Sequence, residues 1–120
     1  MLDHIGLVVT DYARSREFFQ TALAPLGYAV MMEFGTVAGF GAGGKPDFWI
    51  SQRSGASPVH VAFSSPSRAT VDTFYKTAIA AGGRDNGPPG LRPQYHPHYY
   101  GAFVYDPDGN NIEAVCHRPE

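Results

Sequence analysis

The chain has 120 residues, a mass of 13.0 kDa and a formal net charge of −2, and 43% of its residues are apolar. This length supports one domain, residues 1–120. The sequence has no cluster of basic residues of the kind that binds nucleic acids. No apolar run reaches the roughly 18 residues of a membrane span, and the N-terminal stretch lacks the features of a signal peptide. We therefore expect a cytoplasmic protein without nucleic-acid or membrane partners, and its single cysteine, Cys116, excludes an internal disulfide.

The first half of the chain predicts a strand, a helix and three further strands. Ile5, Leu7 and Val9 alternate with other residues, as expected for a strand with one buried face. Asp11 is a candidate N-cap for a helix whose apolar residues recur at helical spacing, and Gly27 is a candidate C-cap. Strand-like segments follow at 28–34, 36–41 and 47–52.

The second half repeats this pattern. Residues 60–83 align with residues 4–27 without a gap, and seven positions are identical, including His4 with His60. Ser67 is the candidate N-cap of the second helix. Further strands are expected at 99–105 and 111–117. The sequence therefore predicts an α+β fold of two β-α-β-β-β modules, about 1–54 and about 57–118, with curled mixed sheets around a cup.

Two histidines and one acid are expected on the strand faces that turn away from the helices. His4 and His60 occupy equivalent positions, and a small residue follows each of them two positions later on the same face. Glu113 alternates with Ile112 and Ala114, which form an apolar face, so its carboxylate points to the opposite face. Two imidazoles and one carboxylate that converge on a cup suit one divalent metal ion, with Fe, Mn, Ni and Zn as alternatives.

The segments LDHIGLVV, PVHVAFSS and YDPDGNNIEAV, together with the paired modules, resemble the vicinal oxygen chelate superfamily of glyoxalase, bleomycin-resistance and extradiol-dioxygenase proteins. This resemblance covers nearly the whole chain. It implies that His4, His60 and Glu113 bind the metal, and that the chain forms a homodimer with sites shared between subunits. Glyoxalase I-like members also carry an acid on the last strand of the first module, where DFWISQ offers only Trp49 or Ser51. The resemblance therefore does not extend to lactoylglutathione lyase activity.

The segment NGPPGLRPQYHPH, residues 86–98, is rich in proline and glycine, and we expect a loop there rather than a regular strand. Either this loop forms a lid over the cup or its polar and aromatic residues pack as in an ordinary loop. If it is a lid, the candidate catalytic residues are His96, His98, Tyr99 and Tyr100, and the candidate substrate-binding residues are Trp49, Arg92 and Tyr95.

Two functions follow from these observations. The first is a small metal-dependent enzyme, of the lyase or isomerase type or of the dioxygenase type, that chelates neighbouring oxygens of a small-molecule substrate. The second is a bleomycin-resistance-like protein that binds and sequesters a small molecule without catalysis. The pair of equivalent histidines favours the first.

Overall fold

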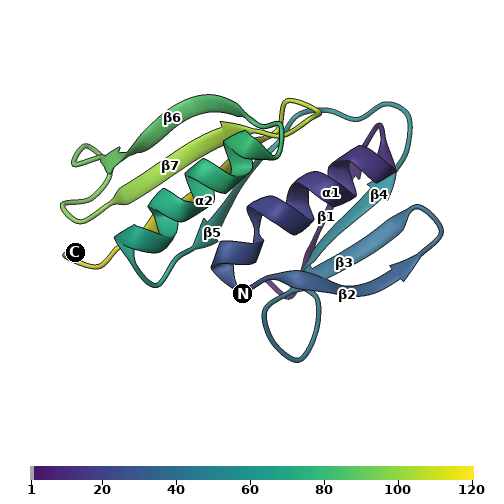
Figure 1. The fold of residues 1–120 in the computed structure, drawn as a ribbon, viewed down its shortest axis with the longest axis horizontal. Coiled ribbons are helices and arrows are strands. Elements are labelled where there is room, and N and C mark those ends of the chain that lie inside the picture. The colour runs from purple at the N-terminus through teal and green to yellow at the C-terminus, as the bar shows by residue number, and fades with distance from the viewer. Residues whose placement is uncertain (1) are drawn as a thin grey trace.

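The computed structural model describes residues 2–120 and contains two similar modules, each with one four-stranded sheet and one long helix (Figure 1). The first module contains β1 (Ile5–Val9), α1 (Tyr12–Ala22), the 3₁₀ turn η1 (Ala24–Leu26), β2 (Ala29–Phe34), β3 (Val37–Gly41) and β4 (Phe48–Gln52). The second contains β5 (His60–Ser64), α2 (Arg68–Ala80), β6 (Arg84–Leu91), β7 (Tyr100–Tyr105) and β8 (Asn111–Cys116). The predicted α+β fold of two β-α-β-β-β modules is confirmed.

The two sheets have the same topology. Their strand orders are β1-β4-β3-β2 and β5-β8-β7-β6, with a parallel pair at the first strand of each module and antiparallel pairs elsewhere. The parallel pair requires a crossover connection, which the helix and the following strands supply. The two sheets do not join to form one closed sheet.

Each helix begins at the residue that the sequence predicts. The side chain of Asp11 accepts a hydrogen bond from the backbone N–H of Arg14 at 3.2 Å, and Ser67 accepts one from the N–H of Thr70 at 3.1 Å. These bonds satisfy backbone donors that a helix leaves unpaired at its start. One side of each helix is buried, and it is formed by Ser15, Phe18, Phe19 and Ala22 in α1 and by Val71, Phe74 and Ala78 in α2.

The modules meet mainly through their helices. Helices α1 and α2 lie side by side, each in front of its sheet (Figure 1). The ring of Phe63 on β5 lies 5.3 Å from the rings of Tyr28 and Phe48 in the first module. The hydroxyl of Thr10 also donates a hydrogen bond to Asp108 at 2.5 Å. The helices therefore cover one face of each sheet, and we call the opposite face the open face.

The prediction of a loop over residues 86–98 is wrong in its first half, because β6 runs from Arg84 to Leu91. This strand lies at the edge of its sheet and pairs only with β7. Its register shifts between Asp85 and Gly87 and again between Gly87 and Gly90. An edge strand with such irregularities accommodates two prolines, which cannot donate a backbone hydrogen bond. The sequence 86–98 thus combines an irregular strand with a shorter loop.

No helix of residues 2–120 is long and apolar enough to cross a membrane.

Candidate functional site

A cavity of about 440 Å³ lies on the open face of the second sheet. Its lining residues are His60 on β5, Phe103 on β7, Glu113 on β8, and Tyr95 and Tyr99 in the segment between β6 and β7. Three neighbouring strands and one loop therefore contribute to it. This volume is within the range of sites for small molecules.

Glu113 is the only ionisable carboxylic acid among these lining residues, and it is only 1% exposed. In the sheet it lies between Ala62 of β5 and Phe103 of β7. Its Oε1 atom lies 2.9 Å from Nε2 of His60, and its Oε2 atom accepts a hydrogen bond from the hydroxyl of Tyr99. A buried carboxylate needs such partners, because burial without them is costly. The prediction that Glu113 points away from the helix face is therefore correct, and two partners occupy its carboxylate.

Tyr99 reaches Glu113 because the sheet has no side chain between them. A Cβ atom added at Gly101 would lie 3.3 Å from Oε2 of Glu113 and 3.1 Å from the ring of Tyr99. Desolvation, followed by the hydrogen bond to Glu113, raises the pKa of Tyr99 well above its usual range. Tyr99 therefore keeps its proton at neutral pH and acts as a hydrogen-bond donor to the carboxylate.

His60 is the more accessible member of the pair, with a side chain that is 52% exposed. Its ring centroid lies 6.3 Å from that of Phe103, which forms the neighbouring wall of the cavity. Two residues further along β5, Ala62 presents only a methyl group on the same face. A ligand in the cavity can therefore approach the imidazole from solvent.

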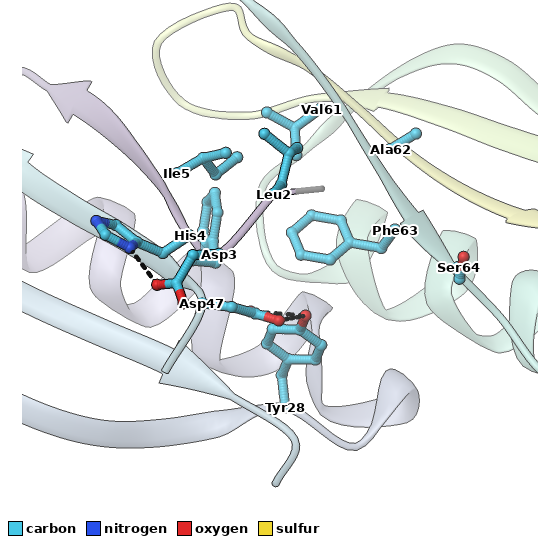
Figure 2. A pocket seen from close by; sticks show the side chains of 11 residues that line it. Leu2, Asp3, His4, Ile5, Tyr28, Asp47, Val61, Ala62, Phe63 and Ser64 are labelled. Carbon is cyan, nitrogen blue, oxygen red and sulfur yellow. Dashed lines mark hydrogen bonds and ion pairs between the residues drawn. The ribbon is translucent and has the colours of Figure 1, made fainter. Parts of the chain in front are cut away.

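His4 lies elsewhere. It precedes β1, its side chain is 58% exposed, and its Nδ1 atom lies 2.7 Å from Oδ1 of Asp3. It lines a second cavity, of about 300 Å³, at the junction of the two modules (Figure 2). Within residues 2–120, no group of three or more His, Cys, Asp or Glu side chains is placed to hold a metal ion. One chain therefore brings together two of the three predicted ligands and leaves His4 apart from them.

The second cavity contains a separate polar pair. The hydroxyl of Tyr28 donates to the carboxylate of Asp47 at 2.8 Å (Figure 2). Desolvation and this hydrogen bond raise the pKa of Tyr28 to about 12. Asp47 is engaged at this junction, and it does not line the cavity of His60 and Glu113 in the described part of the chain.

Residues 92–99, which we call the lid loop, contribute Tyr95 and Tyr99 to the lining of the larger cavity. The loop is held at its ends, because the backbone N–H of Arg92 donates to the carbonyl of Tyr99 at 2.7 Å. Inside it, the ring of Tyr95 lies 5.1 Å from that of Tyr99 in an edge-to-face arrangement. The guanidinium of Arg92 lies 5.4 Å from the ring centroid of Phe103. Of the predicted residues, Tyr95 and Tyr99 therefore line the cavity, and Arg92 lies beside it, next to the lining residue Phe103.

Three other predicted residues do not reach it. His96 and His98 are exposed on the outside of the lid loop, with ring centroids 5.8 Å apart. The ring of His96 also lies 5.5 Å from that of His117, which in turn is 5.1 Å from Tyr99. Tyr100 points to the helix face of the sheet, where its hydroxyl donates to Asp72 of α2 at 2.6 Å.

Trp49 lies on the open face of the first sheet, not in the cavity. A Cβ atom at Gly39 would lie 2.8–2.9 Å from three atoms of the indole, so the ring covers that glycine. The ring of Phe34 lies 6.3 Å away. Phe103 is the lining residue that the sequence reasoning missed. Its signal was present, because it shares strand parity with Tyr99, but only the pairing of β7 with β8 places it beside Glu113.

Comparisons with known proteins agree with this fold. The profile of the "Glyoxalase/Bleomycin resistance protein/Dioxygenase superfamily" matches residues 1–114. A glyoxalase/bleomycin resistance protein from Albidiferax ferrireducens T118 is 26% identical, with a TM-score of 0.85 over 97% of this chain and 98% of that one. A glyoxalase/bleomycin resistance protein/dioxygenase family enzyme from Burkholderia phytofirmans PsJN is 18% identical, with a TM-score of 0.77 over 97% and 98% of the two chains.

A mutant glyoxalase I from Zea mays is 20% identical, with a TM-score of 0.74 over 95% of this chain and 46% of that one. None of the curated proteins matches the chain significantly. The chain belongs to the Glyoxalase/Bleomycin resistance protein/Dioxygenase superfamily, as the sequence motifs predict.

Proposed function

We propose that this protein is a divalent-metal-dependent enzyme that acts on a small molecule, and that His60 and Glu113 are two of its metal ligands. The observation that supports this proposal is the 2.9 Å contact between Nε2 of His60 and Oε1 of Glu113 at the wall of a 440 Å³ cavity. An imidazole nitrogen and a carboxylate oxygen that face the same space are a donor pair for Fe, Mn, Ni or Zn.

The residues of one chain supply two of the three ligands proposed for such a site. Tyr99 holds Oε2 of Glu113, which leaves Oε1 directed toward His60 and the cavity. A carboxylate that is fixed by an outer hydrogen bond is a common arrangement around protein-bound metals. Two protein ligands are too few for a stable site, so a third ligand must come from elsewhere. His4 is exposed and lies apart from His60 and Glu113 in the same chain. We therefore propose that the third ligand is the His4 side chain of a second copy of the chain.

A homodimer would supply that ligand. The open face of the first sheet exposes apolar side chains, including Met32 at 49% and Phe34 at 58%, next to Trp49. A twofold arrangement in which this face meets the open face of the partner's second sheet would cover these side chains. It would also create two equivalent sites, each with His4 from one subunit and His60 with Glu113 from the other.

In such a site the metal would supply Lewis-acid activation of two neighbouring substrate oxygens. The chain's own residues contribute binding and orientation. Phe103, Tyr95 and Tyr99 form an aromatic wall, and the lid loop limits access of water from one side. On β4, Trp49 and Ser51 take the open-face positions, so this strand provides no second carboxylate for proton transfer. We therefore favour a lyase, isomerase or dioxygenase reaction other than lactoylglutathione formation.

The alternative is a binding protein without catalysis. Both oxygens of Glu113 already have protein partners, and the walls of the cavity are largely aromatic. Such a cavity can hold a planar molecule without a metal. Metal content distinguishes the two functions.

The experiment is elemental analysis of protein purified without a nickel column. We expect near-stoichiometric metal in the wild type and in His117→Gln, an exposed histidine outside the cavity, and loss of metal in His60→Gln and Glu113→Gln. Mixing His4→Ala with Glu113→Gln chains then tests the shared site, because one of the two sites in a mixed dimer regains all three ligands. Equal metal in all variants would refute the metal site, and exchange of subunits without return of metal would refute the sharing.

A further inference from the structure

The guanidinium of Arg92 lies over the ring of Phe103, on the open face of the second sheet. Its central carbon lies 5.4 Å from the centroid of Phe103, and its Nη2 atom donates to the carbonyl of Pro88 at 2.8 Å. Two glycines of β6 make room for it, since a Cβ atom at Gly87 would lie 3.2 Å from Nη2 and one at Gly90 would lie 3.1 Å from Nη1. The cation therefore has a fixed position rather than a freely moving one.

This position is next to the cavity. Phe103, on which the guanidinium lies, is one of the lining residues, and the backbone N–H of Arg92 closes the lid loop on Tyr99. The positive charge also acts at the hydroxyl of Tyr99, where it partly opposes the rise in the pKa of that group. Arg92 thus contributes positive charge to the side of the cavity where Tyr99 lies.

Arg92 forms no ion pair with the carboxylates of residues 2–120, whereas Arg16, for example, pairs with Glu33 at 2.5 Å. Of the five N–H donors of a guanidinium, the described residues accept one hydrogen bond, at the carbonyl of Pro88. The one carboxylate among the lining residues of the cavity, that of Glu113, has Tyr99 and His60 as its partners. A fixed cation with unused donors beside a cavity can bind an anion.

We propose that Arg92 recognises a carboxylate on the ligand of this cavity, and that the ligand is a small aromatic or otherwise planar carboxylate. Its ring would lie against Phe103, Tyr95 and Tyr99, and its carboxylate would take the two parallel N–H donors of the guanidinium. One guanidinium matches the two oxygens of a carboxylate, whereas a doubly charged phosphate usually requires several donors or cations. No Arg or Lys is among the described lining residues of the cavity, so Arg92 acts from beside it. The inference rests on the proposed use of this cavity for the substrate, but it does not require the metal.

The test uses benzoate and its neutral isostere benzamide as probes, with binding measured by calorimetry in the presence of a chelator. The variants are Arg92→Gln, which removes the charge, and Arg92→Lys, which retains it without the planar fork. Arg84→Gln is the matched control, because Arg84 on β6 also lies over an aromatic ring, that of Tyr105 at 5.1 Å, but Tyr105 is not among the lining residues of the cavity. Circular dichroism and melting temperature verify that each variant is folded.

We expect the wild type and Arg84→Gln to bind benzoate about tenfold or more tightly than benzamide, as a charge-assisted hydrogen bond predicts. Arg92→Gln should abolish this preference and Arg92→Lys should retain part of it. Failure of the wild type to bind either probe, equal binding of both, or a preference that survives Arg92→Gln would overturn the inference. Tighter binding of phenyl phosphate than of benzoate would overturn the carboxylate assignment. A preference for benzoate that depends on Arg92, in protein that never binds metal, would refute the metal proposal alone.

Discussion

The hydrogen bond from Tyr99 to Glu113 can be tested directly, because the neighbouring residue provides a matched control. Tyr99→Phe removes one hydroxyl donor and leaves the ring in place. The acceptor is a carboxylate that is 1% exposed, so water has little access to replace the lost donor. Tyr100→Phe removes the same hydroxyl one residue later, but its acceptor, Asp72, is only half-buried. The two variants therefore differ mainly in the burial of the acceptor.

The expected magnitudes follow from that difference. Loss of a hydrogen bond to a buried charged group costs about 1.5–3 kcal/mol of unfolding free energy, whereas loss of one to an accessible group costs about 0.5–1 kcal/mol. In a chain of this length each kcal/mol corresponds to about 4 °C in melting temperature. Tyr99→Phe should therefore lower the melting temperature by about 6–12 °C, and Tyr100→Phe by about 2–4 °C.

Thermal and urea unfolding at one protein concentration measure these values, and competition with a chromogenic chelator measures metal affinity. If Glu113 is a metal ligand, Tyr99→Phe should weaken metal binding by about 10–100-fold, because it releases the orientation of a ligand. Tyr100→Phe should leave metal binding unchanged. Equal destabilisation by the two variants, or equal metal affinity, would refute the assignment of Tyr99 as the residue that positions Glu113.

Two further predictions concern the first module. The pKa of Tyr28 is raised to about 12 from the ordinary value of 10.0, so its stabilising effect is complete below pH 10 and is lost as the pH rises through 12. Tyr28→Phe should therefore reduce this loss of stability at alkaline pH. The same variant should remove one tyrosine from the late phase of an absorbance titration. Gly39→Ala should displace the indole of Trp49, shift its fluorescence and destabilise the fold by about 1–3 kcal/mol, while Gly6→Ala, which has open space around the added methyl group, should change neither. An unchanged titration or an unchanged emission spectrum would contradict the respective prediction.

The repeat in the sequence was sufficient to predict the fold. The alignment of 60–83 with 4–27, with an N-cap at each helix, describes local patterns that the structure reproduces. The strand β6 was missed because proline and glycine usually exclude a regular strand, and only its place at the sheet edge makes it compatible with them. Edge or central position depends on long-range pairing, which composition does not reveal.

The candidate site was predictable to the extent that it depends on alternation within a strand. Alternation places Glu113 on the open face and separates Tyr99 from Tyr100, but it does not state which of the two tyrosines shares a face with Glu113. That choice depends on the pairing of Phe103 with Glu113. The separation of His4 from His60 and Glu113 depends on how the two modules pack against each other. A repeat in the sequence does not determine that packing.

The register of the two sheets explains why equivalent modules carry different chemistry. Gly6 and Ala62 occupy equivalent positions in the repeat, and their neighbours on the adjacent strand are Trp49 and Glu113. The next strand then supplies Gly39 beside Trp49 and Phe103 beside Glu113. The aromatic ring therefore lies on β4 in the first sheet and on β7 in the second, so that one open face presents an indole where the other presents a carboxylate. If a dimer pairs the two kinds of face, each cup receives one buried carboxylate and one indole, and a divalent ion there would have one carboxylate ligand, which balances half of its charge.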